Sequence, residues 1–127
     1  MNLPLNTLAD TSDRLEQARY NMIEQQVRPW NLFDERVLDL MQTLRREDFV
    51  PAHYRDMAFS DMEIPLHDDP IEALRLGQIM LAPRVEARMA QDLKVKATDL
   101  VLEIGAGWAS VAALVAGLAA EVTTLEI

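Results

Sequence analysis

The sequence predicts an α/β protein in which a helical region precedes the first strand–helix–strand unit of a doubly wound parallel sheet. Two patterns carry this prediction. Before residue 98, apolar residues recur at helical spacing; after it come a continuous apolar run, a glycine-containing turn, an Ala/Val/Leu-rich segment and a second apolar run. The chain has 127 residues, of which 50% are apolar and 26% charged, and this composition is that of one globular domain or a part of one.

The first predicted helix follows a leader. Residues 1–13 show no apolar periodicity, and we expect them to be flexible. Ser12 or Asp13 can cap the helix, and Glu16 is placed to close a capping box with Asp13. The helix should end at Arg28-Pro29, because proline disfavours helical conformation in the residue before it. Its apolar stripe consists of Leu15, Ala18, Met22 and Ile23.

Three further helices are predicted. One begins near Asp34, and its apolar face consists of Val37, Leu40, Met41 and Leu44. A short one covers residues 52–57, after Pro51, which suits a first helical turn. Pro83 can open the last of them, in which apolar residues repeat every four positions, at Val85, Met89 and Leu93. We expect the methionines at helical spacing to be core residues.

Residues 14–97 as a whole are predicted to be a helical region with an irregular segment inside it. That segment covers residues 60–77. Within it, 60–66 can include a short edge strand, and 67–70 are typical of a polar turn.

Residues 98–127 are predicted to begin a nucleotide-binding domain. Residues 100–104 form a nearly continuous apolar run, which is typical of a strand covered on both faces. Two glycines then make a tight turn into a helix over about 108–118, and residues 121–127 predict a second strand. A right-handed crossover would place the second strand parallel to the first.

The candidate binding residues in this unit are two glycines and two glutamates. Gly105 permits the sharp turn from strand to helix, and Gly107 lets a ligand approach the backbone because it has no side chain. Glu126 follows about 20 residues later, at the end of the second strand, where a carboxylate can accept hydrogen bonds from ribose hydroxyls. Glu103 lies two positions before the first glycine.

Two cofactor classes fit this pattern. A dinucleotide-binding turn would have a third glycine where this chain has Ser110. A methyltransferase-type turn has an acidic residue at the position of Glu103, whose carboxylate can hold the amino group of S-adenosylmethionine but would repel a pyrophosphate. We therefore expect S-adenosylmethionine, with a nicotinamide dinucleotide or a plain structural turn as alternatives. Trp108 could stack on a cofactor ring, but we expect it to pack.

Charge and composition exclude several classes of function. The chain has 21 acidic and 12 basic residues, a net charge of −9 and a pI near 4.6, which argues against nucleic acid or an anionic membrane as the main partner. It has no cysteine, so disulfides and thiolate catalysis are excluded. His53 and His67 lie far from any ligand partner, and we expect no metal site. Without an apolar run of about 20 residues or a basic, apolar N-terminus, a soluble cytoplasmic protein is expected.

Residues upstream of the glycines form a second, more specific pattern. Its members are Arg45-Arg46-Glu47-Asp48-Phe49-Val50-Pro51, Tyr54, Ala58-Phe59-Ser60-Asp61, Gly77-Gln78 and Pro83. They run in the order seen in the protein-L-isoaspartate O-methyltransferases, and residues 18–29 resemble the start of a bacterial branch of that family. The chain resembles this family from about residue 14 onward.

The resemblance implies a class I, Rossmann-like S-adenosylmethionine-dependent methyltransferase fold with an added N-terminal helical region. It implies that Gln78 joins Glu103, Gly105, Gly107 and Glu126 in binding the cofactor. It also implies methyl transfer to the carboxylate of an isoaspartyl residue in a protein or peptide, which starts the repair of that residue. An ionised carboxylate needs no strong general base, so we assign no catalytic residue.

Two features separate this chain from the family pattern. Ile79 and Leu81 stand where the family has a threonine and a serine. The family's sheet also has more strands than the two predicted here, so we expect a truncated N-terminal part that is inactive alone. The alternative is a non-catalytic relative that acts as an association or regulatory module. A two-stranded sheet with unpaired edges is marginal by itself, and we expect a homo-oligomer.

Overall fold

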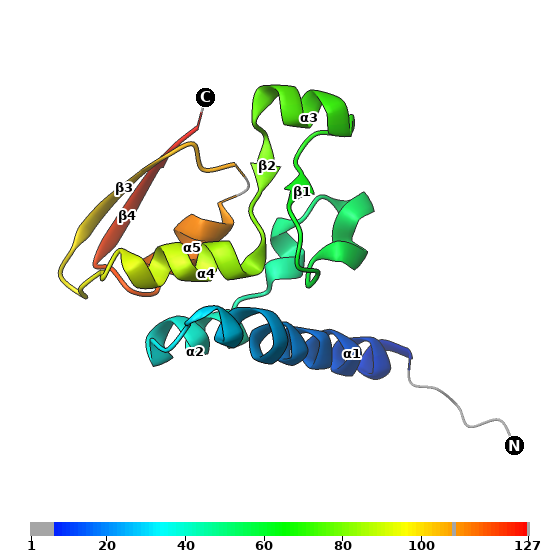
Figure 1. The fold of residues 1–127 in the computed structure, drawn as a ribbon, viewed down its shortest axis with the longest axis horizontal. Helices are drawn as coiled ribbons and strands as arrows, with labels where there is room; N and C mark the ends of the chain where they lie inside the picture. Colours follow the sequence, from blue (N-terminus) through cyan, green and yellow to red (C-terminus); the bar gives the residue numbers. More distant parts are fainter. Residues whose placement is uncertain (1–6, 108, 127) are drawn as a thin grey trace, which may run out of the picture.

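The computed structural model describes residues 7–107 and 109–126, with side chains from residue 12 onward. Figure 1 shows a lower layer of helices, an arm that rises from it and a parallel two-stranded sheet beside the arm. In chain order the elements are α1 (Thr7–Met22), α2 (Glu35–Thr43), β1 (Ile64–Pro65), α3 (Pro70–Leu76), β2 (Ile79–Met80), α4 (Pro83–Asp92), β3 (Leu100–Ile104), α5 (Ser110–Ala116) and β4 (Glu121–Leu125).

Helix α1 begins earlier than the sequence suggested. It starts at Thr7, so a start at Ser12 or Asp13 is wrong; residues 1–6 of the predicted leader lie outside the described part. After Met22 the helix widens into a π-helical turn and then tightens into a 3₁₀ turn that contains Pro29. The predicted stop at Arg28-Pro29 is therefore only approximate: the α-helix ends at Met22, Arg28 keeps helical φ and ψ of −56° and −44°, and Asn31, with a positive φ of 61°, ends the helical turns.

The predicted second helix is confirmed as α2, where the Asp34 side chain accepts a hydrogen bond from the Arg36 amide at 3.0 Å. The predicted short helix after Pro51 is a 3₁₀ helix, Ala52–Met57, and another 3₁₀ helix, Arg46–Phe49, precedes it.

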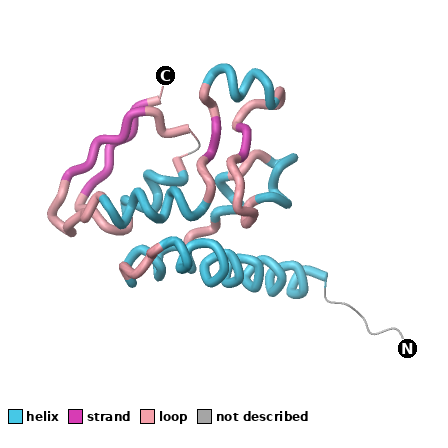
Figure 2. Tube along the Cα trace, viewed as in Figure 1, coloured by secondary structure: helices cyan, strands magenta, loops and turns pink. Residues whose placement is uncertain are grey.

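The irregular segment and the residues just after it, together 60–81, form the arm, which Figure 2 shows as two short strands joined through a helix. The predicted edge strand is β1, and it pairs antiparallel with β2. The polar turn predicted over 67–70 is present as a bend over residues 67–69, and Pro70 already belongs to α3. Asp69 caps this helix by accepting hydrogen bonds from the Ile71 and Glu72 amides. Gly77, with a φ of 70°, ends α3.

The strand–helix–strand unit is confirmed. Strand β3 pairs parallel with β4 in a register that runs from Leu100 opposite Glu121 to Ile104 opposite Leu125. The expectation that β3 is covered on both faces is wrong, because Leu100, Leu102 and Ile104 are 78%, 60% and 70% exposed. Helix α5 covers only the opposite face, where Val101 and Val122 pack against the core. The described residues place no element over the exposed face.

Helix α4 joins the helical layer to the β–α–β unit, because it contacts both α2 and α5. Its buried face differs from the predicted one: Met89 and Leu93 are exposed, whereas Glu86 and Gln91 are buried. Hydrogen bonds to distant segments make this possible. The Gln91 side chain accepts from the amides of Phe33 and Asp34 at 2.9 and 3.0 Å and donates to the Asn31 carbonyl at 2.9 Å.

The main core lies between α1, α2, α4 and α5, and a smaller cluster supports the arm. The methionine prediction is partly confirmed: Met22, Met41 and Met80 are buried, but Met57, Met62 and Met89 are exposed. No helix in the described part of the chain has both the length and the apolarity that crossing a membrane needs.

Candidate functional site

The glycine turn lies at the carboxyl end of β3 and leads into α5. Gly105 and Gly107 have positive φ angles of 85° and 55°, and Ala109 follows with 66°. A Cβ on Gly107 would lie 3.0 Å from Cδ1 of Leu66, a residue of the arm. Glycine at 107 therefore serves both the turn and the close approach of the arm. Trp108, expected to pack, lies outside the described residues.

Glu126 follows β4 and lies beside the glycine turn. Its carboxylate accepts a hydrogen bond from the Gly107 amide, and the Gly105 amide donates to the Leu125 carbonyl at 2.7 Å, so the turn is joined to the end of β4 at two points. A carboxylate has about four acceptor positions. The bond to Gly107 therefore leaves acceptor capacity for ribose hydroxyls.

Glu103 is the chemically unusual residue of the site. Its Oε1 atom is buried and has no hydrogen-bond partner among the described residues. Burial raises the pKa of this carboxyl above its ordinary value, and the negative charge of Glu126 raises the pKa further. A buried acceptor without a donor is unfavourable, so the position suits a ligand that brings a donor or a positive charge.

The predicted cofactor residues line one cleft between the glycine turn and the arm. Two adjoining hollows share Leu66, Ile79, Ile104, Gly105 and Gly107. One of them extends to Glu103, and the other extends to Gln78 and Glu126. The structure thus brings all five predicted residues to one concave surface.

The arm forms the apolar wall of this cleft. Ile79 and Leu81 both line it, in the positions where the sequence comparison expected hydroxyls. The Leu66 amide donates to the Gln78 carbonyl at 2.8 Å, and the Gln78 amide donates to the Ala73 carbonyl at 2.9 Å. These backbone bonds hold the start of β2 in place, so the wall is part of a hydrogen-bonded element.

Glu86 also lines the cleft, and sequence reasoning missed it. It is 5% exposed and accepts hydrogen bonds from Arg46 and from Ser110, each at 2.8 Å. Burial raises the pKa of Glu86, and the nearby Arg46 guanidinium and the Ser110 hydroxyl act against that rise. The sequence does hold one indication that Glu86 is buried: it is the single acidic residue on a helix face that it shares with the small residues Ala87 and Ala90.

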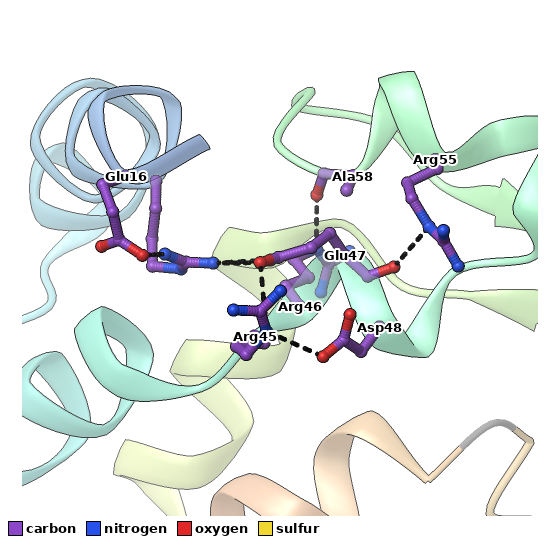
Figure 3. Close-up of polar contacts among 8 residues, drawn as sticks. Glu16, Arg45, Arg46, Glu47, Asp48, Arg55 and Ala58 are labelled. Atoms are coloured by element: carbon purple, nitrogen blue, oxygen red, sulfur yellow. Dashed lines mark hydrogen bonds and ion pairs between the residues drawn. The ribbon is translucent and has the colours of Figure 1, made fainter. Parts of the chain in front are cut away.

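A second set of charged residues joins α1 to the 3₁₀ helix at 46–49, which precedes the arm (Figure 3). Nη2 of Arg19 donates to both carboxylate oxygens of Glu47 at 2.6 Å, and the two side chains are 1% and 2% exposed. Figure 3 shows Arg55 reaching the backbone of Glu47, a contact of 3.3 Å, and Arg46 reaching the Ala58 carbonyl at 2.7 Å. These contacts fix the backbone from which the arm rises.

The described residues contain no group of three or more His, Cys, Asp or Glu side chains arranged to hold a metal ion.

Comparison with known proteins identifies the family. The model of the family described as protein-L-isoaspartate(D-aspartate) O-methyltransferase matches residues 17–126. The chain belongs to this family. Curated relatives named protein-L-isoaspartate O-methyltransferase include those of Koribacter versatilis, 40% identical over 116 residues, and of Herpetosiphon aurantiacus, 37% identical over 115 residues. Each alignment covers 91% of this chain and 48% of the relative, so this family member spans about half the length of the curated relatives it matches.

A solved structure supports the fold. It is titled protein-L-isoaspartate O-methyltransferase and aligns with a TM-score of 0.60 and 19% identity, over 87% of this chain and 33% of that chain. At this identity the likeness concerns the fold alone. The expected α/β fold, with the first β–α–β unit of a Rossmann-like methyltransferase after a helical region, is confirmed.

Proposed function

We propose that the cleft of this family member is the S-adenosylmethionine site of an enzyme that transfers a methyl group to the carboxylate of an isoaspartyl residue in a protein or peptide, and that the 127 residues supply the cofactor side of that enzyme rather than the whole of it. The observation that carries the proposal is the half-buried Glu103, whose buried Oε1 atom has no donor among the described residues, in the same cleft as the glycine turn and Glu126. Membership of the family adds the reaction class.

Each cleft residue has a role in this proposal. Glu103 receives the cationic amino group of the cofactor's methionine part, which supplies the missing donor and offsets the cost of burying the carboxylate. Glu126 accepts hydrogen bonds from the ribose hydroxyls while Gly107 holds it in place. Gly105 and Gly107 let the cofactor approach the backbone without a side chain between them. Gln78 lines the other end of the cleft.

The reaction demands alignment more than proton transfer. When bound, the cofactor supplies an electrophilic methyl group on a sulfonium. A substrate carboxylate with a pKa near 4 is ionised at neutral pH, so it attacks without a general base. The contribution of Ile79 and Leu81 is an apolar wall that excludes water from the acceptor side of the cleft. No residue of this chain is assigned a catalytic proton transfer.

We further propose that the 127-residue chain by itself is inactive and self-associates in the cytoplasm. The support for self-association is the exposed apolar face of β3 and β4, made of Leu100, Leu102, Ile104 and Leu125. The support for inactivity is that the 127 residues span about half the length of the curated relatives they match. Large exposed apolar patches favour association. The same face, with the loss of hydroxyls at Ile79 and Leu81, supports the second candidate function, which is a non-catalytic association or regulatory module.

Calorimetric titration and a methyl-transfer assay test these proposals together. The chain and its Glu103→Gln variant are titrated with S-adenosylmethionine, and methyl transfer from labelled cofactor to an isoaspartyl peptide is measured beside a matched aspartyl peptide. Binding by the chain that weakens in Glu103→Gln supports the cofactor role. No binding at millimolar cofactor refutes that role and favours the association module, and transfer to the isoaspartyl peptide refutes both the module and the proposed inactivity.

A further inference from the structure

The Glu86 carboxylate joins three segments that are distant in sequence. It lies on α4, its Oε2 atom accepts from Nη1 of Arg46 at 2.8 Å, and its Oε1 atom accepts from Oγ of Ser110 at 2.8 Å. Arg46 belongs to the 3₁₀ helix at 46–49, and Ser110 is the first residue of α5. One carboxylate therefore connects the helical layer to the element that follows the glycine turn.

Arg46 holds the other side of this arrangement. It is 7% exposed, its Nε atom donates to the Ala58 carbonyl at 2.7 Å, and its Nη2 atom donates to the Leu81 carbonyl at 2.8 Å. Because a guanidinium is planar and its donors have fixed directions, three such bonds determine its position closely. The oxygens of Glu86 are thus presented to Ser110 from a rigid support that also contacts the arm.

Ser110 in turn lies close to the cofactor residues. It follows Ala109, whose positive φ of 66° completes the glycine turn, and it lines the cleft together with Glu103, Gly105 and Gly107. A strained turn keeps its conformation only when its surroundings hold it. The Gly107 amide is bonded on the β4 side by Glu126, and the Ser110 hydroxyl is bonded on the α4 side by Glu86.

We propose that Glu86, with Arg46 behind it, is a positioning residue that holds Ser110 and thereby sets the conformation of the glycine turn for cofactor binding. This inference rests on the proposed cofactor function. It differs from that function in assigning no contact between Glu86 and the cofactor, since both oxygens of Glu86 are engaged by the protein.

Ser110→Ala removes the bond with the smallest change in volume. Hydrogen bonds to charged groups are strong enough that their loss changes a local equilibrium by about tenfold or more. We expect hydrogen exchange at the Gly105 and Gly107 amides to become about tenfold faster, and the dissociation constant for S-adenosylmethionine to rise by a similar factor. Ser110→Thr keeps a hydroxyl and should restore both values.

Thr43→Ala is the matched control, because the Thr43 hydroxyl donates within its own helix, α2, to the carbonyls of Asp39 and Leu40, and among the described residues it has no hydrogen bond to another segment. Exchange is followed by NMR on the labelled chain, and the cofactor constant by calorimetry. Faster exchange at the glycine turn in Ser110→Ala alone, reversed in Ser110→Thr, supports the inference. Unchanged exchange in Ser110→Ala, or an equal change in Thr43→Ala, overturns it.

The two measurements separate this inference from the proposed function. If the unaltered chain binds no cofactor, the proposed function fails, while the exchange rates still decide whether Glu86 and Ser110 hold the turn. If the chain binds cofactor and Ser110→Ala binds it equally well, the proposed function stands and the positioning role is refuted.

Discussion

Glu47→Ala should destabilise the fold strongly although Glu47 lies on the short 3₁₀ helix at 46–49. The substitution removes both carboxylate oxygens that face Nη2 of Arg19 at 2.6 Å. Arg19 is 1% exposed, and its Nε atom already lacks a hydrogen-bond partner among the described residues. The guanidinium, which also lies 5.3 Å from the centre of the Phe59 ring, would keep only Glu16 as a counter-charge.

The expected magnitude follows from the burial of both partners. Removing one member of a buried ion pair costs about 3–5 kcal/mol, because the remaining charge is left without compensation. Glu16 is 54% exposed and still reaches Arg19, so we expect the lower end of that range. A loss of about 3 kcal/mol lowers Tm by roughly 10–15 °C in a domain of this size.

Thermal and urea denaturation followed by circular dichroism measure this loss. Glu72→Ala is the matched control, because it breaks the Glu72–Arg75 pair on α3, which lies at the surface, and should leave Tm nearly unchanged. The double variant Arg19→Met, Glu47→Leu should recover most of the stability, since it removes both charges and keeps the volume. A Tm of Glu47→Ala equal to that of Glu72→Ala, or a double variant as unstable as Glu47→Ala, would refute the reasoning.

Three further predictions concern the cleft and the sheet. Gly107→Ala should lower the free energy of unfolding in urea more than Gly77→Ala does. Both glycines have a positive φ, but a Cβ at 107 would lie 3.0 Å from Cδ1 of Leu66, whereas a Cβ at 77 would have no atom within 4 Å. Equal losses in the two variants would contradict the close approach of Leu66 to Gly107. Cofactor affinity should fall as the pH is lowered through the raised pKa of Glu103, because protonation removes the charge that holds the amino group. This loss should begin above the pH expected from the ordinary glutamate pKa of 4.5 and should be absent in Glu103→Gln. Calorimetry at several pH values measures the affinity, and an affinity that rises as the pH is lowered would contradict the prediction. Leu102→Glu should reduce self-association in sedimentation experiments, because this side chain is 60% exposed on the apolar face, and an unchanged distribution of species would exclude that face as the interface.

Local patterns in the sequence were sufficient to predict the β–α–β unit. The apolar run of β3, the glycines at 105 and 107 and the spacing to Glu126 each act within a few residues or along one crossover, so their consequences follow from backbone geometry. One side of the cleft, with Glu103, Gly105, Gly107 and Glu126, was predictable for the same reason, since the carboxyl ends of two parallel strands meet at one edge of the sheet. Gln78, on the opposite side, followed only from the family resemblance.

The errors lie where distant partners decide burial. On α4, Glu86 and Gln91 point into the protein core because their polar atoms have hydrogen-bond partners there. Arg46 and Ser110 bond Glu86, and the backbone at residues 31–34 bonds Gln91. The spacing of residues within α4 does not reveal these partners. Helix α3 was not predicted, although Asp69 and Gly77 are typical residues for the start and the end of a helix. It has no buried apolar stripe, since Ile71 and Leu74 are 80% and 69% exposed.

The central claim is that the cleft between the glycine turn and the arm binds S-adenosylmethionine. An NMR titration of the labelled chain with this cofactor tests it most directly, with the reduced nicotinamide dinucleotide as comparison. We predict saturable shifts at the amides of Gly105, Gly107 and Gln78, with none at residues 12–18 of α1, which line neither hollow of the cleft. Absence of shifts at millimolar cofactor, shifts confined to other segments, or equal shifts with the nicotinamide compound would contradict the claim.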